Sequence, residues 1–391
     1  MTNLVAREAA SIIQTYRRLP VEFVRGEGSW LFDGLGSDYL DCLSGIAVTS
    51  VGHANPRVAE AVARQMATLV HVSNLFYTVP QVELAERLTN LSGLDRVFFS
   101  NDGATANEAA IKLARRWGRE KRGPECHEII SLDGSFHGRT LATLAATGQP
   151  QKQAAFYPLP RGFVQVRPGD LDAVRAALHP GTAAVMIETT QGEGGVIPLE
   201  EEYLRDLRQL CDDNEVLMIV DDVQAGVGRT GTWFSWQRLG FVPDIATAAK
   251  ALANGLPIGV CMASEEVSES FRPGDHATTF GGGPAVCAAA LATLAIIEDD
   301  GVLANALERE RQFRSLLAGM PGVREVRGRG LLLGVALTEP VAARLVLAAL
   351  DEGLIVNNVL PDTVRFTPPL TITESETEEA ASRFARSLAT L

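Results

Sequence analysis

The stretch that decides the fold is "VLMIVDD", residues 216–222, in which five apolar residues are followed by two acidic ones. An unbroken apolar run predicts a strand that is buried on both faces, as in a parallel sheet covered by helices on both sides. Ligands of such sheets bind beyond the carboxyl ends of the strands. We therefore expect an α/β fold whose functional residues follow the strands, beginning with the two acids that end this one.

Short strand-like runs alternate with helical patterns on both sides of this stretch. This alternation predicts a mostly parallel central sheet with helices on both faces. The helix after the first of these strands has an apolar stripe of Ala106, Ala109, Ala110, Leu113, Ala114 and Trp117. The other strands and helices are expected at "RVFF" (96–99), "EIISL" (128–132), "TLATLAATG" (140–148), "AAVMIE" (183–188), "EYLRDLRQLCDD" (202–213) and "IGVCMAS" (258–264).

A chain of 391 residues is too long for a single compact core, and its pattern changes after about residue 285. We expect a large domain over residues 56–285 and a smaller α+β domain over 286–391, joined by the N-terminal segment 1–55. The features expected in the smaller domain are a hairpin within 24–41, helices over 288–298 and 302–318, a Gly-rich strand "GRGLLLGVAL" (328–337) and a helix after "TITESE" (371–376).

Composition excludes several classes of function. The formal net charge of −13, from 48 acidic and 35 basic residues, disfavours nucleic acid and anionic membranes as partners. Five widely spaced cysteines without a C-x-x-C pair argue against disulfides or a metal site and indicate a reducing compartment. The N-terminus lacks the apolar core of a signal peptide, and no apolar run is long enough to span a bilayer. A cytoplasmic protein is expected.

Candidate binding residues follow four of the expected strands. Gly103 and Ala104 lie in a turn that opens a helix, whose free N–H groups can hold a phosphate. Phe136 follows the next strand, Asp221 ends the apolar one, and Lys250 follows "DIATAA" (244–249). A lone lysine in an alanine-rich segment is typical of a solvated helix face. A phosphate cradle, an aromatic face, a buried acid and a lysine together are what pyridoxal phosphate (PLP) requires.

A second pattern, "GVGRTG" at 226–231, matches the glycine spacing of dinucleotide-binding turns and follows a strand. It is followed by the aromatic segment "TWFSWQRLG" rather than by a long helix, and no acid lies about twenty residues further on. The dinucleotide interpretation is therefore rejected.

The chain resembles the ornithine-type (class III) aminotransferases over nearly its whole length. The motifs are "SFHGRT" (135–140), "QGEGGVIP" (191–198), "VDDVQAGVGRTG" (220–231), "AAKALANGLPIG" (248–259), "TTFGGGP" (278–284) and "VRFTPPL" (364–370). The resemblance implies a fold-type-I PLP-dependent transferase. Segments of the first hundred residues most resemble the acetylornithine branch, which implies amino transfer from N-acetylornithine to 2-oxoglutarate in arginine biosynthesis, with glutamate as a product.

The resemblance also implies roles around the cofactor. Lys250 would form the Schiff base and move a proton, and Asp221 would pair with the ring nitrogen. Gln224 would approach the ring hydroxyl, while Val223 and Phe136 would cover the two faces of the ring.

The cofactor phosphate would be shared between subunits. Gly103 and Ala104 would offer it backbone N–H groups, and Thr279 would reach the phosphate of the neighbouring subunit. The resemblance therefore implies a homodimer with shared active sites.

Four further residues would bind the substrates. Arg139 would hold the carboxylate remote from the reacting amine, and Arg365 the carboxylate next to the reacting carbon of 2-oxoglutarate or glutamate. Glu193 would neutralise Arg365 while the ω-amino substrate is bound. Ile46 stands where ornithine aminotransferases usually carry tyrosine, and an apolar residue there favours an acylated amine over a charged one. A planar guanidinium suits each carboxylate because it binds bidentately.

Two alternatives to this function stay open. The donor could be another ω-amine, such as ornithine, 4-aminobutyrate, succinylornithine or an intermediate of specialised metabolism. The second alternative is a non-catalytic PLP-binding module. A module without turnover, however, has no need of two arginines that bind carboxylates.

The match loosens at Asp102, Thr105 and Asp222, where the family usually carries other residues. A carboxylate at position 102 would repel a phosphate at short range, or would instead cap the helix that starts there. Gln191 and His137 either bind the ligand or only support the site.

Overall fold

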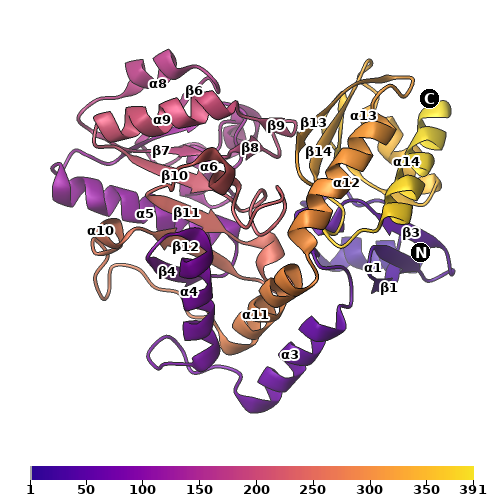
Figure 1. The fold of residues 1–391 in the computed structure, drawn as a ribbon, viewed down its shortest axis with the longest axis horizontal. Helices are drawn as coiled ribbons and strands as arrows, with labels where there is room; N and C mark the ends of the chain where they lie inside the picture. Colours follow the sequence, from indigo (N-terminus) through magenta and orange to yellow (C-terminus); the bar gives the residue numbers. More distant parts are fainter. Residues whose placement is uncertain (1) are drawn as a thin grey trace.

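A computed structural model describes residues 2–391 (Figure 1). Its central sheet has seven strands in the order β4-β12-β11-β10-β7-β5-β6. Every neighbouring pair is parallel except the two that involve β12. The strands are β4 (Arg96–Ser100), β5 (Glu128–Leu132), β6 (Phe163–Val166), β7 (Thr182–Ile187), β10 (Leu217–Asp221), β11 (Ile245–Ala248) and β12 (Gly259–Ala263). The expected mostly parallel sheet is confirmed. The strand in "IGVCMAS" is antiparallel because the connection 249–258 is too short for a crossover.

Both faces of this sheet are buried, as the apolar run at 216–220 predicts. In β10, Leu217 and Ile219 point into one hydrophobic cluster, and Met218 and Val220 into another on the opposite face. The first cluster lies under α5 (Gly103–Lys121), whose predicted apolar stripe is buried throughout. The second includes residues of α9 (Glu201–Asp213). Helices therefore cover both faces of the sheet.

Other elements surround the sheet and connect its strands. Helix α4 (Val79–Ser92) contacts β4, and α8 (Leu171–Ala177) contacts β6. The remaining elements of this part are α3 (Pro56–Thr68), α6 (Leu141–Ala146), α7 (Pro150–Gln153), η1 (Ala154–Phe156), β8 (Thr190–Gln191), β9 (Ile197–Pro198), η2 (Ser235–Leu239), η3 (Lys250–Ala253) and α10 (Glu265–Ser268). The short α2 (Ser44–Ala47) instead contacts the C-terminal part of the chain, where Ser44 Oγ donates to the Thr367 carbonyl oxygen at 2.5 Å.

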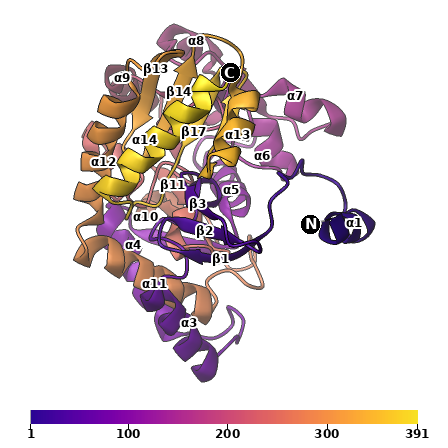
Figure 2. The same cartoon turned by 90° about the vertical axis from the view of Figure 1, so that its right-hand side faces the viewer.

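Two four-stranded sheets form a smaller part of the molecule, on the right in Figure 1. One sheet has the order β1-β2-β3-β15, and its β3 and β15 pair in parallel, so segments from both ends of the chain share it. The other has the order β13-β14-β17-β16, with helices packed beside it (Figure 2). These elements are β1 (Phe23–Glu27), β2 (Trp30–Asp33), β3 (Asp38–Asp41), α12 (Val302–Leu317), β13 (Val323–Arg329), β14 (Leu332–Leu337), α13 (Ala342–Asp351), β15 (Leu354–Ile355), β16 (Asn357–Leu360), β17 (Thr363–Phe366) and α14 (Glu374–Ala389).

Two local expectations for this part need correction. The hairpin expected within 24–41 is a meander of three antiparallel strands. The strand expected over 328–337 is a hairpin, in which the end of β13 turns at Gly330 into β14. Gly330 has φ +56°, and a Cβ atom there would lie 2.3 Å from the Arg229 carbonyl oxygen, so the turn requires glycine.

The domain boundaries at 55/56 and 285/286 stay a proposal. Helix α11 (Pro284–Asp299) begins at the second boundary and packs against α3 and α4 of the larger part. Helix α1 (Thr2–Ser11) lies apart from β1, β2 and β3 (Figure 2). Between residues 2 and 391, no helix is both long and apolar enough to traverse a bilayer.

Hydrogen bonds of an arginine in the "GVGRTG" segment join the two parts of the molecule. Arg229, within "GVGRTG", is fully buried and donates to the carbonyl oxygens of Leu331 and Pro368, at 3.0 and 2.6 Å, and to Ser50 Oγ at 3.0 Å. Burial lowers the pKa of its guanidinium to about 9. Carbonyl oxygens from the smaller part thus replace an acidic partner for this arginine.

Helix α5 begins with a capping box. Asp102 Oδ1 accepts from the backbone N–H of Thr105 at 2.7 Å, and Thr105 Oγ1 accepts from the backbone N–H of Asp102 at 3.0 Å. Asp102 therefore caps helix α5, as in the second of the two possibilities raised by its sequence position. The two unusual residues at 102 and 105 act as a pair.

We predict that Asp102→Ala destabilises the cofactor-free protein by about 1 kcal/mol, because Thr105 loses its acceptor, whereas Asp102→Ser retains most of the stability. Thermal and urea unfolding of the two variants measure the difference. Equal loss in both would show that the cap does not stabilise the helix.

Candidate active site

A cavity of about 440 Å³ opens at the carboxyl ends of the parallel strands. Its volume is in the usual range of small-molecule sites. Eight residues predicted from the sequence line it: Gly103, Ala104, Phe136, Arg139, Asp221, Val223, Gln224 and Lys250. They follow β4, β5, β10 and β11, so the sheet brings together residues that are far apart in the sequence.

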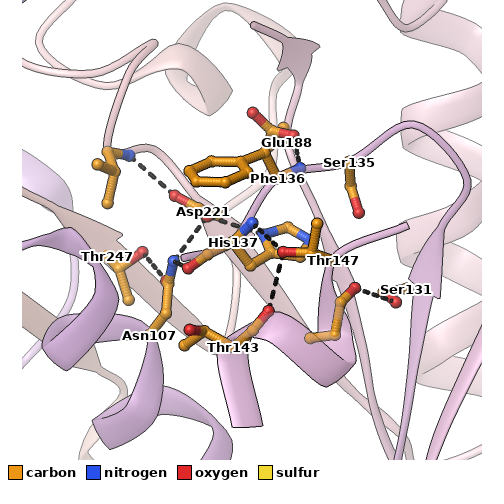
Figure 3. A network of polar contacts seen from close by, with 12 residues as sticks. Asn107, Ser131, Ser135, Phe136, His137, Thr143, Thr147, Glu188, Asp221 and Thr247 are labelled. Atoms are coloured by element: carbon orange, nitrogen blue, oxygen red, sulfur yellow. Dashed lines mark hydrogen bonds and ion pairs between the residues drawn. The ribbon is translucent and has the colours of Figure 1, made fainter. Parts of the chain in front are cut away.

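The Asp221 carboxylate is the centre of a buried network (Figure 3). Its Oδ2 atom accepts from Asn107 Nδ2 at 2.7 Å and lies 2.8 Å from His137 Nδ1. Its Oδ1 atom accepts from the backbone N–H of Val223 at 3.1 Å. Thr247 Oγ1 donates to Asn107 Oδ1 at 2.7 Å and so fixes which end of the amide faces Asp221. The carboxylate is held in one orientation by groups from α5, β11 and two loops.

Asn107 is a site residue that the sequence interpretation missed. Its signal is visible in retrospect, because Asn107 is the one polar side chain among the otherwise apolar buried residues of α5. The two ambiguous residues are now placed. His137 supports Asp221, and Gln191 donates to the Asp133 carbonyl oxygen at 2.9 Å and does not line the cavity.

Lys250 is the first residue of η3, two residues after the end of β11, and lines the cavity. Its φ of +42° is in the left-handed region, a strained conformation that surrounding contacts must maintain. Burial lowers the pKa of its ammonium, and the nearby charge of Arg365 lowers it further. The amine is therefore more readily deprotonated than that of an ordinary lysine.

Arg365 and Glu193 form an ion pair beside the cavity. Arg365 is fully buried and donates through Nη1 to Glu193 Oε1 at 2.6 Å and to Gln224 Oε1 at 3.0 Å. Its Nε atom donates to Asn357 Oδ1 at 3.1 Å. Burial raises the pKa of Glu193, but the charge and hydrogen bond of Arg365 outweigh burial and leave it below its usual value.

Phe136 and Arg139 both line the cavity and belong to the turn after β5. The Arg139 guanidinium carbon is 5.5 Å from the centre of the Phe136 ring. The Phe136 backbone N–H donates to Glu188 Oε2 at 2.9 Å, which fixes the turn that carries the ring. Burial raises the pKa of Glu188 to about 7. Arg139 is exposed, and its guanidinium has no hydrogen bond or ion pair with residues 2–391.

Four predicted residues are not among those that line this cavity: Arg365 and Glu193, which lie beside it, and Thr279 and Ile46. Thr279 is exposed and lines two separate hollows beside Ser73, Asn74 and Gln81. Ile46 lies in α2 with φ +68° and is 37% exposed, whereas Val48, two residues later, lines the cavity. The roles predicted for Thr279 and Ile46 stay predictions.

The residues at the cavity fit PLP and an acidic substrate. Gly103 and Ala104 belong to the first turn of α5, whose N–H groups have no acceptor within the helix. A Cβ atom at Gly103 would lie 2.6 Å from Val223 Cγ1, so glycine leaves the space between that backbone and Val223 open. Arg365 Nη2 is buried and has no partner among the described residues, which leaves a donor for a carboxylate. In residues 2–391, His, Cys, Asp and Glu form no group suited to a metal ion.

Comparisons with known proteins identify the family of the chain. The family model of the class-III aminotransferases matches residues 12–388. The acetylornithine aminotransferase of Gloeobacter violaceus is 48% identical over 94% of this chain and 93% of its own, and that of Methanocaldococcus jannaschii 46% identical over 95% and 94%.

Solved structures of aminotransferases have the same fold as this chain. The ornithine aminotransferase of Toxoplasma gondii has a TM-score of 0.96 at 32% identity, covering 100% of this chain and 95% of its own. The N-acetylornithine aminotransferase of Stenotrophomonas maltophilia has a TM-score of 0.85 at 34% identity, covering 99% and 98%. The fold is therefore that of a fold-type-I, PLP-dependent enzyme. More narrowly, the chain belongs to the class-III aminotransferase family.

Asp222 gives a prediction for the pH dependence of stability. Burial raises the pKa of this carboxyl to about 7, from an ordinary value of 3.8. The proton that it keeps in the folded protein stabilises the fold at low pH, and this contribution is lost as the pH rises through about 7. Asp222→Asn, which stays neutral, should therefore gain roughly 1 kcal/mol or more over the native protein between pH 5 and pH 7.

Unfolding measured at several pH values for both proteins checks this. A constant difference in unfolding free energy across that range would contradict the raised pKa.

Proposed function

We propose that this enzyme transfers the δ-amino group of N-acetylornithine to 2-oxoglutarate, forming N-acetylglutamate 5-semialdehyde and glutamate. The observation that carries the proposal is the pairing of Arg365 with Glu193, next to a cavity that also contains Arg139. A paired arginine suits an ω-amine, which has no carboxylate next to its reacting carbon. Release of Glu193 makes the same arginine available to 2-oxoglutarate. The curated relatives named acetylornithine aminotransferase support this choice of donor.

The cofactor would be held by residues that line one cavity. Lys250 would bind it covalently, Asp221 would pair with its ring nitrogen, and the N–H groups of Gly103 and Ala104 would bind its phosphate. Gln224 would use its amide nitrogen for the ring hydroxyl, because its Oε1 atom already accepts from Arg365.

PLP, when bound, accepts the electrons of the bond that breaks at the substrate carbon. Asp221 would face the ring nitrogen in one orientation, because three neighbouring groups hold its side chain. Lys250 Nζ gives up a proton more readily than an ordinary lysine, since burial lowers its pKa, and so suits the transfer of a proton. Phe136 and Val223 cover the reacting region and exclude water.

The two arginines would orient the substrates in opposite senses. Arg139 would bind the carboxylate remote from the reacting amine, and Arg365 the carboxylate next to the reacting carbon. Glu193 would hold Arg365 during the first half-reaction and release it during the second. Both substrates would then place their reacting carbon near Lys250.

Donor choice is the part of the proposal with the most alternatives. The apolar Ile46 suits an acylated amine better than the free α-ammonium of ornithine, because burying an unpaired charge is costly. Ornithine, 4-aminobutyrate and succinylornithine stay as alternative donors.

A homodimer is part of the proposal. A cluster of exposed apolar residues lies near Thr279: Leu69, Val70, Leu75, Phe76, Tyr77, Val79 and Phe280. Asn74, within this segment, donates to the Thr278 carbonyl oxygen at 3.1 Å and so ties it to the loop that carries Thr279. A second copy of the chain would cover such a patch and bring Thr279 to the partner's site.

The cytoplasm is the proposed compartment. All five cysteines are buried and free, which fits a reducing environment.

We expect Lys250→Ala to lose the visible absorption band of covalently bound PLP and at least about 10³-fold in turnover, because no other amine takes its place. In the native enzyme, the first half-reaction should be faster with N-acetylornithine than with ornithine or 4-aminobutyrate. Single-turnover absorbance measurements give these rates. An unchanged band in Lys250→Ala would refute the cofactor assignment, and an equal or faster rate with ornithine would refute the role of Ile46.

The shared site predicts complementation between two inactive variants. Lys250→Ala inactivates its own site, whereas Thr279→Asp should impair the site of the partner by repelling the phosphate. A hybrid dimer keeps one intact site, so co-expression of both variants should restore about a quarter of the native activity. Activity no greater than that of the two variants purified separately would show that each subunit works alone.

A further inference from the structure

Two cations lie near the same aromatic ring at the edge of the cavity. The Arg139 guanidinium carbon is 5.5 Å from the centre of the Phe136 ring, and Lys152 Nζ is 4.9 Å from it. Lys152 belongs to α7 and is half-buried, whereas Phe136 and Arg139 belong to the turn after β5. Two separate segments thus bring a positive charge to the ring that lines the site.

Lys152 is held in this place by a polar chain. Its Nζ atom donates to Gln149 Oε1 at 2.5 Å. Gln149 Nε2 in turn donates to the carbonyl oxygens of Gly134 and Ser135, at 3.1 and 3.2 Å, in the turn that carries Phe136. A lysine on an ordinary solvated surface does not require a chain of hydrogen bonds to hold its ammonium in place. The position of the ammonium is therefore coupled to that of Phe136.

Neither cation is neutralised by the protein. Across residues 2–391, no carboxylate lies within 4 Å of either the Lys152 ammonium or the Arg139 guanidinium. The nearest acid of the substrate site, Glu193, is already paired with Arg365. Burial lowers the pKa of Lys152; the charge of Glu193 raises it, and the charge of Arg139 lowers it further. A ligand carboxylate between the two cations would relieve this repulsion.

We propose that Lys152 is a second cation for the remote carboxylate of the substrates, acting with Arg139 across the Phe136 ring. The inference rests on the proposed function, because it concerns the group assigned to Arg139. Both N-acetylornithine and 2-oxoglutarate carry a carboxylate remote from the reacting atom, so Lys152 serves both half-reactions. Lys152 thereby selects ω-amines that carry an acid over those that do not.

The test compares Lys152→Gln, Lys152→Arg and the control Lys121→Gln in the PLP-loaded enzyme. Lys121 is an exposed lysine at the end of α5 that has no contact with Phe136, and its variant has the same net charge as Lys152→Gln. Lys152→Gln should raise KM for N-acetylornithine and for 2-oxoglutarate about fivefold, with kcat within about twofold. Lys152→Arg should restore most of the affinity, and Lys121→Gln should match the native enzyme.

N-Acetylputrescine, the donor that lacks only the carboxylate, separates charge recognition from a structural role. Its kcat/KM should be the same in the native enzyme and in Lys152→Gln. Equal losses with both donors, or an unchanged KM for both acids, would overturn the proposal. Binding of glutarate, a dicarboxylate without a reacting group, should weaken in Lys152→Gln by a similar factor, and calorimetry measures it without turnover.

The two proposals fail in different ways. If the native enzyme does not use N-acetylornithine, the proposed function fails, and 2-oxoglutarate and glutarate still test Lys152. If the native enzyme uses N-acetylornithine and Lys152→Gln binds all three acids normally, the inference about Lys152 fails alone.

Discussion

The buried carboxylate of Asp221 is the constraint on which the rest of the site depends. A carboxylate that is 4% exposed requires hydrogen-bond donors, and Asn107, His137 and the backbone N–H of Val223 supply them. These donors come from α5, from the turn after β5 and from the loop after β10. Satisfying one acid therefore fixes the helix that carries the phosphate-binding turn and the turn that carries Phe136. Lys250 joins the same edge because β11 lies beside β10.

The chain as a whole is acidic, whereas basic side chains gather at its site. The chain as a whole has a net charge of −13, whereas four cations, Arg139, Lys152, Lys250 and Arg365, lie in or beside the cavity. The nearby acids have partners or altered pKa values: Asn107 and the backbone N–H of Val223 donate to Asp221, Glu193 is paired with Arg365, and burial raises the pKa of Glu188 to about 7. An acidic protein thus gathers basic side chains at its site, which suits substrates that carry carboxylates.

The sequence predicted those features that follow from local patterns. The apolar run at 216–220 indicated a strand buried on both faces, and the residues after the strands indicated the positions of Asp221 and Lys250. The antiparallel direction of β12 and the hairpin at Gly330 were missed, because they depend on connection length and on the Arg229 carbonyl oxygen nearby. Asn107 and Lys152 were also missed, since each acquires its meaning only from residues distant in sequence. Thr279 and Ile46 lie outside the cavity of a single chain, so their predicted roles concern a dimer or a bound substrate.

The rate of the first half-reaction in Asp221→Asn tests most directly whether this carboxylate organises the chemistry. Asparagine keeps the size of the side chain and an oxygen that accepts hydrogen bonds, but removes the charge. With PLP bound and the thermal unfolding midpoint near that of the native enzyme, the rate with N-acetylornithine should fall at least about 10²-fold. A rate within about threefold of the native value in a PLP-loaded variant would contradict the central role of Asp221.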